Sequence, residues 1–423
     1  MNRMEYPQLG ESLYQDVLPN GLQLMVLPRP GFSRKLAYFV TDFGAIHRDF
    51  LLDGEKVHAP AGIAHFLEHK MFELPDGRDV SAELASLGAV TNAFTSHDMT
   101  AYYIGCTENF DAALDLLLEF VSTPYFTSES VEKEWGIIDQ EIGMELDSPE
   151  GTCFRNLMTA MYKEHRIREE VLGDCDSIRE ITPELLHACH RAFYTPGNML
   201  LCVVGDVDPD RVAELALNRL GREKKSVGEK VYPWTEDMTV CQPEVRGKME
   251  VAMPMFNLGF KCEPTGKGEE AIRQEILGDL AAEALFGESS QVYLKLYETG
   301  LIDSSFGGGF ETIDGMAMLL CSGDSNDPVA VREELLARSE ELVREGIPEE
   351  QFLRMKRSAF GRRVRDLDSF DSSCFRLCAY KMTDFDYFEF PRVYQNIQRE
   401  EIQEFLARVV RRERCALSVI DPA

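Results

Sequence analysis

The segment that most constrains this chain is AGIAHFLEHKM at residues 61–71, which places charged side chains inside an apolar helical pattern. In a helix of 3.6 residues per turn, His65 and His69 lie one above the other on a single face, with Glu68 beside them. Two histidines at this spacing can arise by chance in an amphipathic helix. The full pattern H-x-x-E-H is more specific, because it inverts the zinc-protease signature H-E-x-x-H and brings the same groups around one point. The segment predicts a helix that binds zinc.

A catalytic zinc usually takes three protein ligands and leaves one position open, so the two histidines need a third ligand from elsewhere in the fold. The helical segment 127–147 carries Glu134 and Glu141 seven residues apart on a shared face, in an apolar context. This spacing favours Glu141 as the ligand and Glu134 as a residue that orients a histidine. Glutamates on helices are often simply solvated, however, and spacing alone leaves three nearby alternatives open: Glu132, Glu145 and Glu150.

Length and pattern indicate two related halves. A chain of 423 residues exceeds one ordinary core, and 44% hydrophobic with 28% charged residues is typical of a folded protein. The segments 251–264 and 268–287 resemble the early strand and helix, but apolar and small residues replace the metal motif. We therefore expect a zinc-binding catalytic domain at 1–225, a linker at 222–245 and a related C-terminal domain at 246–423 that lacks the metal motif.

Periodicity predicts the individual elements. Strands are expected at 20–30, 35–46, 91–106 (a pair), 199–205 and 251–264, and helices at 61–71, 81–88, 108–124, 127–147, 182–195, 211–221 and 268–287.

Composition excludes several classes of partner. The formal charge of −29 argues against nucleic acid and anionic membranes, and it would attract cationic peptides, although solubility explains it equally well. Eleven cysteines without C-x-x-C spacing suit free thiols in a reducing compartment. The longest clean apolar run, at 199–205, is too short to span a bilayer, and the first residues have no signal-peptide pattern. These features predict a cytoplasmic protein.

Three other patterns are weaker candidates for function. His187, Cys189 and His190 fall on mixed helix faces without a carboxylate, so we interpret them as packing and surface residues. The glycines at 307–309 are not followed by the K-[ST] of a phosphate-binding loop. The basic segment 351–366 is expected to pair with neighbouring carboxylates.

The chain resembles the pitrilysin/insulinase family of inverted-motif zinc peptidases, which includes the mitochondrial processing peptidase, and is most similar to its short bacterial two-domain members. The resemblance rests on NGLQLMVLPRPG, GIAHFLEHKMFE, GAVTNAFTSHDMTAYY, VEKEWGIIDQEI, FYTPGNMLLCVVGDVDP and SSQVYLKLYETGLI. It implies His65, His69 and Glu141 as zinc ligands, Glu68 as general base and Glu134 as a supporting residue.

The resemblance also implies an α+β fold of two related domains, each a mostly antiparallel sheet packed with helices, that together form half of a clam-shell chamber. The strand around Asn92 and Ala93 is implied as the edge on which an extended peptide substrate pairs, a mode that reads backbone more than side chains. Without the resemblance, an ordinary edge strand protected by polar residues would explain this segment.

One stretch departs from the family pattern. Many members carry an arginine and a tyrosine that hold the substrate carbonyl, whereas the matching stretch LYETGLIDSSF has Tyr297 in place of the arginine and Asp303 near the tyrosine position. Losing a donor to the oxyanion commonly costs about 100- to 1000-fold in rate.

We therefore expect a zinc endopeptidase that cleaves short unfolded peptides or peptide precursors inside an enclosed chamber. Its expected partner is a related two-domain chain that supplies the Arg/Tyr pair in a heterodimer, with a homodimer as the second possibility. The alternative function is a non-hydrolytic or weakly active peptide-binding scaffold subunit of a processing or modification complex.

Overall fold

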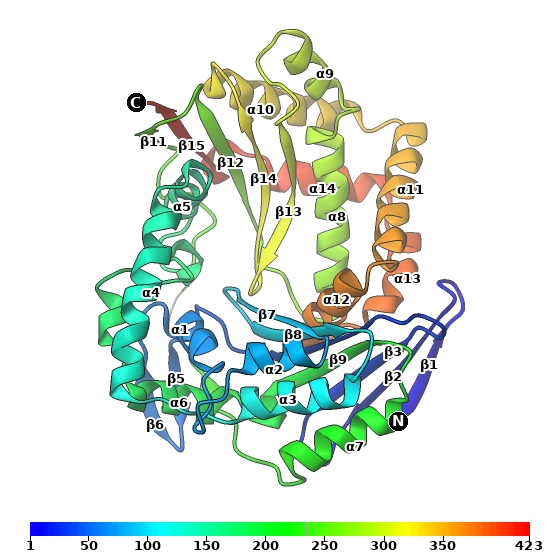
Figure 1. Cartoon of the computed structure of the whole chain (residues 1–423). Helices are drawn as coiled ribbons and strands as arrows, with labels where there is room; N and C mark the ends of the chain where they lie inside the picture. Colours follow the sequence, from blue (N-terminus) through cyan, green and yellow to red (C-terminus); the bar gives the residue numbers. More distant parts are fainter. Residues whose placement is uncertain (233–234) are drawn as a thin grey trace.

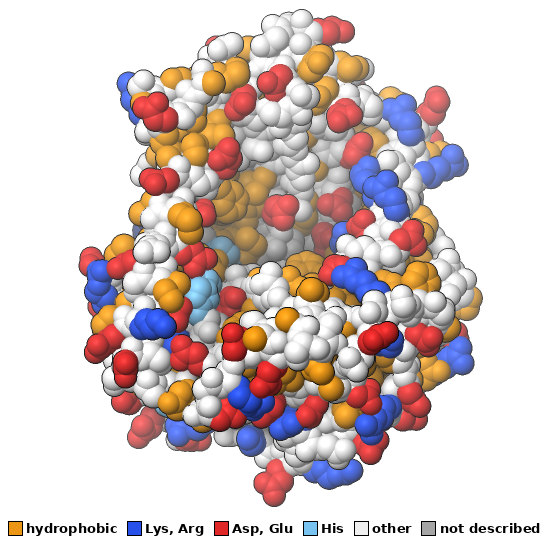
Figure 2. All heavy atoms as spheres, viewed as in Figure 1, with side chains coloured by type: hydrophobic (Ala, Val, Ile, Leu, Met, Phe, Trp, Pro, Cys, Tyr) orange, Lys and Arg blue, Asp and Glu red, His pale blue; other side chains and the backbone are white. Residues whose placement is uncertain are grey.

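The computed structural model of the chain describes residues 1–232 and 235–423, so Pro233 and Trp234 of the expected linker lie outside the described residues. The fold is a mixed α/β architecture with two large, mostly antiparallel sheets, each packed with helices (Figure 1). The space-filling view shows one face of the molecule hollowed between the two halves (Figure 2).

The first sheet, as described, has the order β1-β2-β3-β9-β4-β8-β7, and only the pair β3 and β9 runs parallel. Its strands are β1 (Asn2–Tyr6), β2 (Glu11–Val17), β3 (Gln23–Pro28), β9 (Met199–Gly205), β4 (Lys35–Thr41), β8 (Thr100–Cys106) and β7 (Val90–Thr95). Every residue of the central strand β9 is buried. The strand β7 forms one edge of the sheet, which leaves one side of its backbone free of strand partners.

The first half of the chain also contributes helices, and one of them, α1, carries the metal motif. They are α1 (Ile63–Lys70), α2 (Val80–Ser86), α3 (Phe110–Ser122), α4 (Ser128–Leu146), α5 (Pro149–Met161), α6 (Pro183–Phe193) and α7 (Pro209–Leu220), with 3-10 turns η1 (Arg166–Arg168), η2 (Ser177–Glu180) and η3 (Pro196–Asn198). A capping box between Thr127 and Ser130 fixes the start of α4.

The second sheet, as described, has five strands, and their order repeats that of β3-β9-β4-β8-β7 in the first. Its strands are β11 (Glu244–Met249), β15 (Cys415–Pro422), β12 (Met255–Cys262), β14 (Met316–Asp324) and β13 (Gly307–Ile313), in that spatial order. Within the described residues the parallel pair is β11 and β15, which matches β3 and β9, and the antiparallel order that follows matches β4-β8-β7. The two halves are therefore related, as the sequence predicts.

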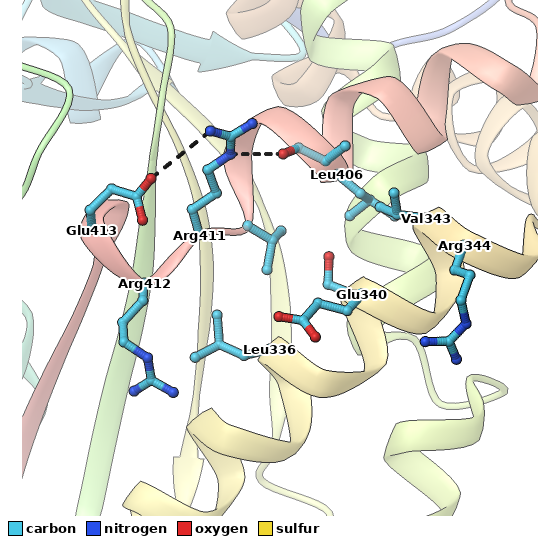
Figure 3. A pocket seen from close by; sticks show the side chains of 11 residues that line it. Leu336, Glu340, Val343, Arg344, Leu406, Arg411, Arg412 and Glu413 are labelled. Atoms are coloured by element: carbon cyan, nitrogen blue, oxygen red, sulfur yellow. Dashed lines mark hydrogen bonds and ion pairs between the residues drawn. The ribbon is translucent and has the colours of Figure 1, made fainter.

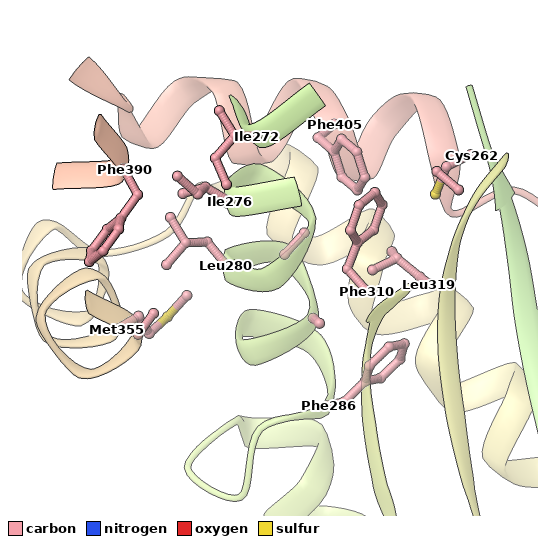
Figure 4. Close-up of a cluster of buried hydrophobic side chains, with 14 of the residues drawn as sticks. Cys262, Ile272, Ile276, Leu280, Phe286, Phe310, Leu319, Met355, Phe390 and Phe405 are labelled. Atoms are coloured by element: carbon pink, nitrogen blue, oxygen red, sulfur yellow. The ribbon is translucent and has the colours of Figure 1, made fainter. Parts of the chain in front are cut away.

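The core of the second half lies between this sheet and its helices. These are α8 (Glu269–Phe286), α9 (Gln291–Glu298), α10 (Pro328–Glu345), α11 (Glu349–Asp366), α12 (Phe370–Met382), α13 (Phe390–Asn396) and α14 (Arg399–Val409), with 3-10 turns η4 (Tyr387–Glu389) and η5 (Arg412–Arg414). Ile272, Ile276 and Leu280 recur every four residues along α8 and are fully buried (Figure 4). This spacing places them on one face of the helix, between the sheet and the outer helices.

The two halves exchange helices. The helix α5 belongs to the first half in sequence but packs against β11, β12 and β15 of the second sheet, whereas α12 packs against β4 and β9 of the first sheet. The boundaries 1–225 and 246–423 therefore stay a prediction, because each sheet is covered in part by a helix from the other half.

The described parts of the segment 222–245 contain regular structure that its irregular pattern does not indicate. The segment contributes β10 (Glu229–Lys230) to a small sheet with β5 (Asp49–Leu52) and β6 (Glu55–His58), and β11 begins at Glu244. Such a short strand carries too little periodicity to be recognised in the sequence.

A buried ion pair also fixes this segment. Glu236 accepts hydrogen bonds from the backbone N–H groups of Lys163, Glu164 and His165, and its Oε1 lies 2.8 Å from Nζ of Lys261, which is 2% exposed. Lys261 belongs to β12, so one carboxylate ties the connecting segment to both halves.

Candidate metal centre

The start of α1 is set by a glycine. Gly62 has φ of 84°, and a Cβ at this position would lie 2.4 Å from the carbonyl oxygen of Leu172. Only glycine adopts this conformation and tolerates this approach without strain. The helix therefore begins at Ile63, which leaves His65 and His69 on successive turns with ring centroids 4.6 Å apart.

The third predicted ligand meets the two histidines. Oε2 of Glu141 on α4 lies 3.6 Å from Nε2 of His65 and 3.7 Å from Nε2 of His69. In the described residues, these three side chains are the one group whose donor atoms could hold a metal ion together. Figure 2 shows histidine side chains at one margin of the hollow.

This donor set fits zinc. With zinc–ligand bonds of about 2.0–2.1 Å in tetrahedral geometry, neighbouring donor atoms stand about 3.4 Å apart. The two distances from Glu141 are close to that value, and two imidazoles with one carboxylate are a catalytic zinc donor set. Three donors leave one position for water or substrate.

Glu134 is placed to orient one histidine. Its Oε1 lies 2.9 Å from Nδ1 of His69, so this carboxylate accepts the Nδ1–H bond and directs the Nε2 lone pair toward Glu141. His65 has no such support: its Nδ1 is buried, with no hydrogen-bond partner among the described residues. The two histidines are therefore fixed to different degrees.

Glu68 lies beside the donors without joining them. Its Oε2 accepts a hydrogen bond of 2.6 Å from Oγ1 of Thr95, the last residue of β7. The side chain is 8% exposed. This contact fixes a carboxylate next to the donor group and connects it to the edge strand.

The edge strand exposes backbone groups next to Glu68. Ser96 closes the hairpin with Met99, and the register pairs Ala93 with Tyr102. Because ladder bonds alternate along an antiparallel strand, N–H and C=O of Ala93 point to the free edge. That N–H donates to Oδ1 of Asn92 at 2.9 Å, so it is satisfied locally without a strand partner.

Burial dominates the electrostatics of the group. It lowers the pKa of His65 to about 3, with a further contribution from His69, so His65 is neutral at physiological pH. Burial also opposes protonation of His69, but the hydrogen bond and charge of Glu134 outweigh it and raise the pKa of His69. For Glu68, burial raises the pKa in spite of the Thr95 hydrogen bond, which suits a group that takes up and releases a proton.

The fold, the inverted motif and this donor set together define a class, the zinc peptidases with an H-x-x-E-H helix. The chain belongs to the insulinase family, peptidase family M16. The family model "Insulinase (Peptidase family M16)" matches residues 57–174, and the model "Peptidase M16 inactive domain" matches residues 180–359.

Individual relatives agree with this assignment. The chain is 36% identical to "Uncharacterized zinc protease YmfH" of Bacillus subtilis, over 99% of both chains. Among solved structures, an M16-like peptidase from Alicyclobacillus acidocaldarius superposes with a TM-score of 0.94 at 32% identity, covering 99% of this chain and 100% of that one. Pitrilysin shares the fold with a TM-score of 0.78 at 16% identity, and this chain covers 45% of its length. Zinc is therefore the cofactor of this protein.

The stretch that departs from the family's Arg/Tyr pattern contributes no side chain to the donor group of His65, His69 and Glu141. Tyr297 is 53% exposed on α9 and stacks on Tyr293, and Asp303 accepts a hydrogen bond of 2.7 Å from the N–H of Ser305. Neither residue is a cationic donor, so the stretch offers no counterpart of the family's arginine.

The weaker candidates are accounted for by packing. Cys189 is fully buried, Nε2 of His190 lies 3.2 Å from the carbonyl oxygen of Val121, and the ring of His187 packs at a tilt against Phe126. The glycines at 307–309 form the start of β13. The basic segment pairs with carboxylates as expected: Arg363 binds Glu275 and Asp279, and Arg362 binds Glu283.

No helix among the described residues has the length and apolar character needed to cross a membrane.

A separate cavity lies far from the metal donors on α1 and α4 (Figure 1). It has a volume of about 470 Å³ and lies between α10 and α14 in the second half (Figure 3). Its arginines form ion pairs within the chain: Arg411 with Glu413, Arg344 with Glu345 and Arg412 with Glu333. It offers no group that acts on the metal centre.

Sequence reasoning missed two residues that contact the carboxylates next to the metal donors: Thr95, which contacts Glu68, and Lys70, which contacts Glu134. Thr95 looks like an ordinary strand residue. Lys70 follows His69 directly and is completely buried. A lysine within an apolar turn was the available signal, because buried lysines are rare unless they are paired.

Proposed function

We propose that this chain is a zinc-dependent endopeptidase that cleaves short, unfolded peptides or peptide precursors. The observation that carries the proposal is the position of Glu68, which lies beside the donors of His65, His69 and Glu141 and is bonded to the end of a free sheet edge. A structural zinc site usually has four protein ligands and no use for such a carboxylate.

In the proposed mechanism the side chains of this protein hold the metal, orient its ligands and transfer protons to and from the reacting groups. Zinc, when bound, lowers the pKa of water and polarises the scissile carbonyl. Oε atoms of Glu68 accept the proton from the attacking water and later deliver it to the leaving amine. Glu134 keeps His69 in the tautomer with a free Nε2, and Thr95 keeps Glu68 in place.

The substrate pairs as an added strand along β7. The outward N–H and C=O of Ala93 bond to the peptide backbone once Asn92 releases that N–H. Because the same strand ends at Thr95, a peptide on this edge lies across Glu68. Recognition of backbone groups predicts broad specificity, and the acidic chain favours cationic peptides.

The hollow between the halves is half of a chamber that a second chain closes. The missing Arg/Tyr pair supports a heterodimer with a related two-domain chain that supplies those donors, and a homodimer is the second possibility. The missing Arg/Tyr pair also favours one alternative function, a weakly active or non-hydrolytic peptide-binding subunit of a processing or modification complex.

The cellular location that fits is the cytoplasm, because all eleven cysteines are unpaired thiols.

Zinc removal tests the proposal. Dialysis against a chelator abolishes cleavage of unstructured peptides, and one equivalent of zinc restores it. Cleavage that persists in zinc-free protein contradicts the mechanism. Size-exclusion chromatography with activity assays tests the partner: a self-dimer that is fully active alone contradicts the split site, and activation by a related chain that carries the Arg/Tyr pair supports it.

A further inference from the structure

Lys70 is one of the largest fully buried side chains of this protein. It is 0% exposed at the last position of α1, immediately after His69. Burial of an ammonium is costly unless its charge is paired and its N–H groups are hydrogen-bonded. The contacts of Lys70 show what pairs it.

Three acceptors surround the ammonium. Nζ of Lys70 lies 2.5 Å from Oε1 of Glu73, 3.2 Å from the carbonyl oxygen of Ser130 and 3.6 Å from Oε2 of Glu134. Ser130 and Glu134 both belong to α4, so the lysine joins the end of α1 to the first turns of the helix that carries Glu141.

Glu134 is thereby held from both sides. Its Oε1 accepts the Nδ1–H of His69, and its Oε2 faces the ammonium of Lys70. The carboxylate is 7% exposed, so little water is available to hold its second oxygen. Without Lys70 the carboxylate would keep one cationic neighbour fewer and would be free to rotate away from His69.

We propose that Lys70 is a positioning residue of the metal centre, which acts through Glu134 to fix the ring of His69 with Nε2 directed at the metal. The inference rests on the proposed metal site and extends it by one residue. Lys70 touches neither the donors nor the substrate edge, so its effect passes through Glu134.

The mutation Lys70→Met tests this role, because methionine fills much of the same volume without charge. Zinc affinity measured by competition with a chelator falls about tenfold, the lower end of what loss of an outer partner costs a metal site. The absorption spectrum of the Co²⁺-loaded protein changes as well, since it reports ligand geometry independently of activity.

A double-mutant cycle separates positioning from general destabilisation. Glu134→Gln lowers zinc affinity by about 10- to 100-fold. If Lys70 acts through Glu134, adding Lys70→Met to Glu134→Gln causes little further loss, because neighbouring residues in one network are not additive.

The matched control is Lys261→Met. Lys261 is also buried and paired with a carboxylate, but it lies on β12 of the second half. This variant lowers thermal stability and leaves zinc affinity within twofold of wild type. If Lys70→Met does not fold, Lys70→Gln replaces it, with a neutral donor on a shorter side chain.

The outcomes are distinct. Wild-type protein that binds no zinc overturns the proposed function. Wild-type protein that binds zinc, together with a Lys70→Met variant of unchanged affinity and unchanged Co²⁺ spectrum, overturns this inference alone. Fully additive losses in the double mutant also overturn it.

Discussion

At the scale of single residues, His65 and His69 on α1 and Glu141 on α4 converge on one point. The carboxylate of Glu68 lies beside them. The histidine pair and Glu68 follow from the helical period and the motif, because all three lie on one short helix. Glu141 is harder to find, since a shared helix face leaves several glutamates possible and the family resemblance singles out one. Lys70 and Thr95 act through partners distant in sequence, which no local pattern reveals.

The choice of Glu141 over its neighbours is open to a direct test. Glu141→Gln replaces an anionic oxygen donor with a neutral amide, so zinc affinity falls by more than the about 10- to 100-fold that loss of an outer partner costs. Glu132→Gln, an exposed position on the same helix, serves as the matched control and keeps zinc. Zinc retained in Glu141→Gln, measured by metal analysis after gel filtration, would rule out this ligand.

At the scale of elements, the strands and helices with a clear period follow from the sequence, whereas short or exchanged elements do not. Neither β10 nor the small sheet carries enough alternation to be recognised. The exchange of α5 and α12 between the sheets is a tertiary arrangement, and amphipathic helices do not specify which apolar surface they cover.

The edge strand offers a selective test of peptide pairing. Proline at Ala93 removes an N–H that faces the free edge, and proline is tolerated at such positions because no ladder bond is lost. Ala93→Pro is expected to raise KM for peptides at least several-fold with zinc content unchanged. Ala93→Ser, which keeps the N–H, is the control and retains wild-type KM. Equal kinetics in both variants would exclude this edge as the docking strand.

The connecting segment makes a pH-dependent contribution to stability. Burial alone would raise the pKa of Glu236, but Lys261 and three backbone N–H groups outweigh it and lower the pKa to about 2 from an ordinary 4.5. A carboxylate whose pKa is depressed by folding stabilises the protein above its unfolded pKa, and this stabilisation is lost as pH falls from about 4.5 toward 2.

Glu236→Gln is therefore expected to lower Tm by a few degrees at pH 7, which corresponds to about 2 kcal/mol after screening by solvent. The difference from wild type shrinks at pH 3.5, because the wild-type carboxylate is then losing this contribution. Thermal melts of the zinc-free wild type and variant at pH 7 and pH 3.5 measure this difference in Tm. A difference that stays constant between them would mean that the ion pair does not act as described.

At the scale of the whole molecule, two related halves play unequal parts. The first half carries the candidate metal donors, the proposed base and the edge strand, whereas the second repeats the order of five strands without the metal motif. The duplication was visible in the sequence because strand and helix patterns recur. The interlocked helices and the hollow were not, since they depend on how the halves pack. Both features support the proposal that this chain forms half of a chamber.

The most direct test of the central claim is peptide cleavage by the zinc-loaded chain, alone and with a related partner, compared with Glu68→Gln. We expect both proteins to hold one zinc ion and only the chain with Glu68 to release peptide fragments, detected by mass spectrometry. Equal cleavage by the variant would contradict the role of Glu68. No cleavage by the wild-type chain in either assembly, with zinc bound, would contradict the peptidase itself and favour the scaffold.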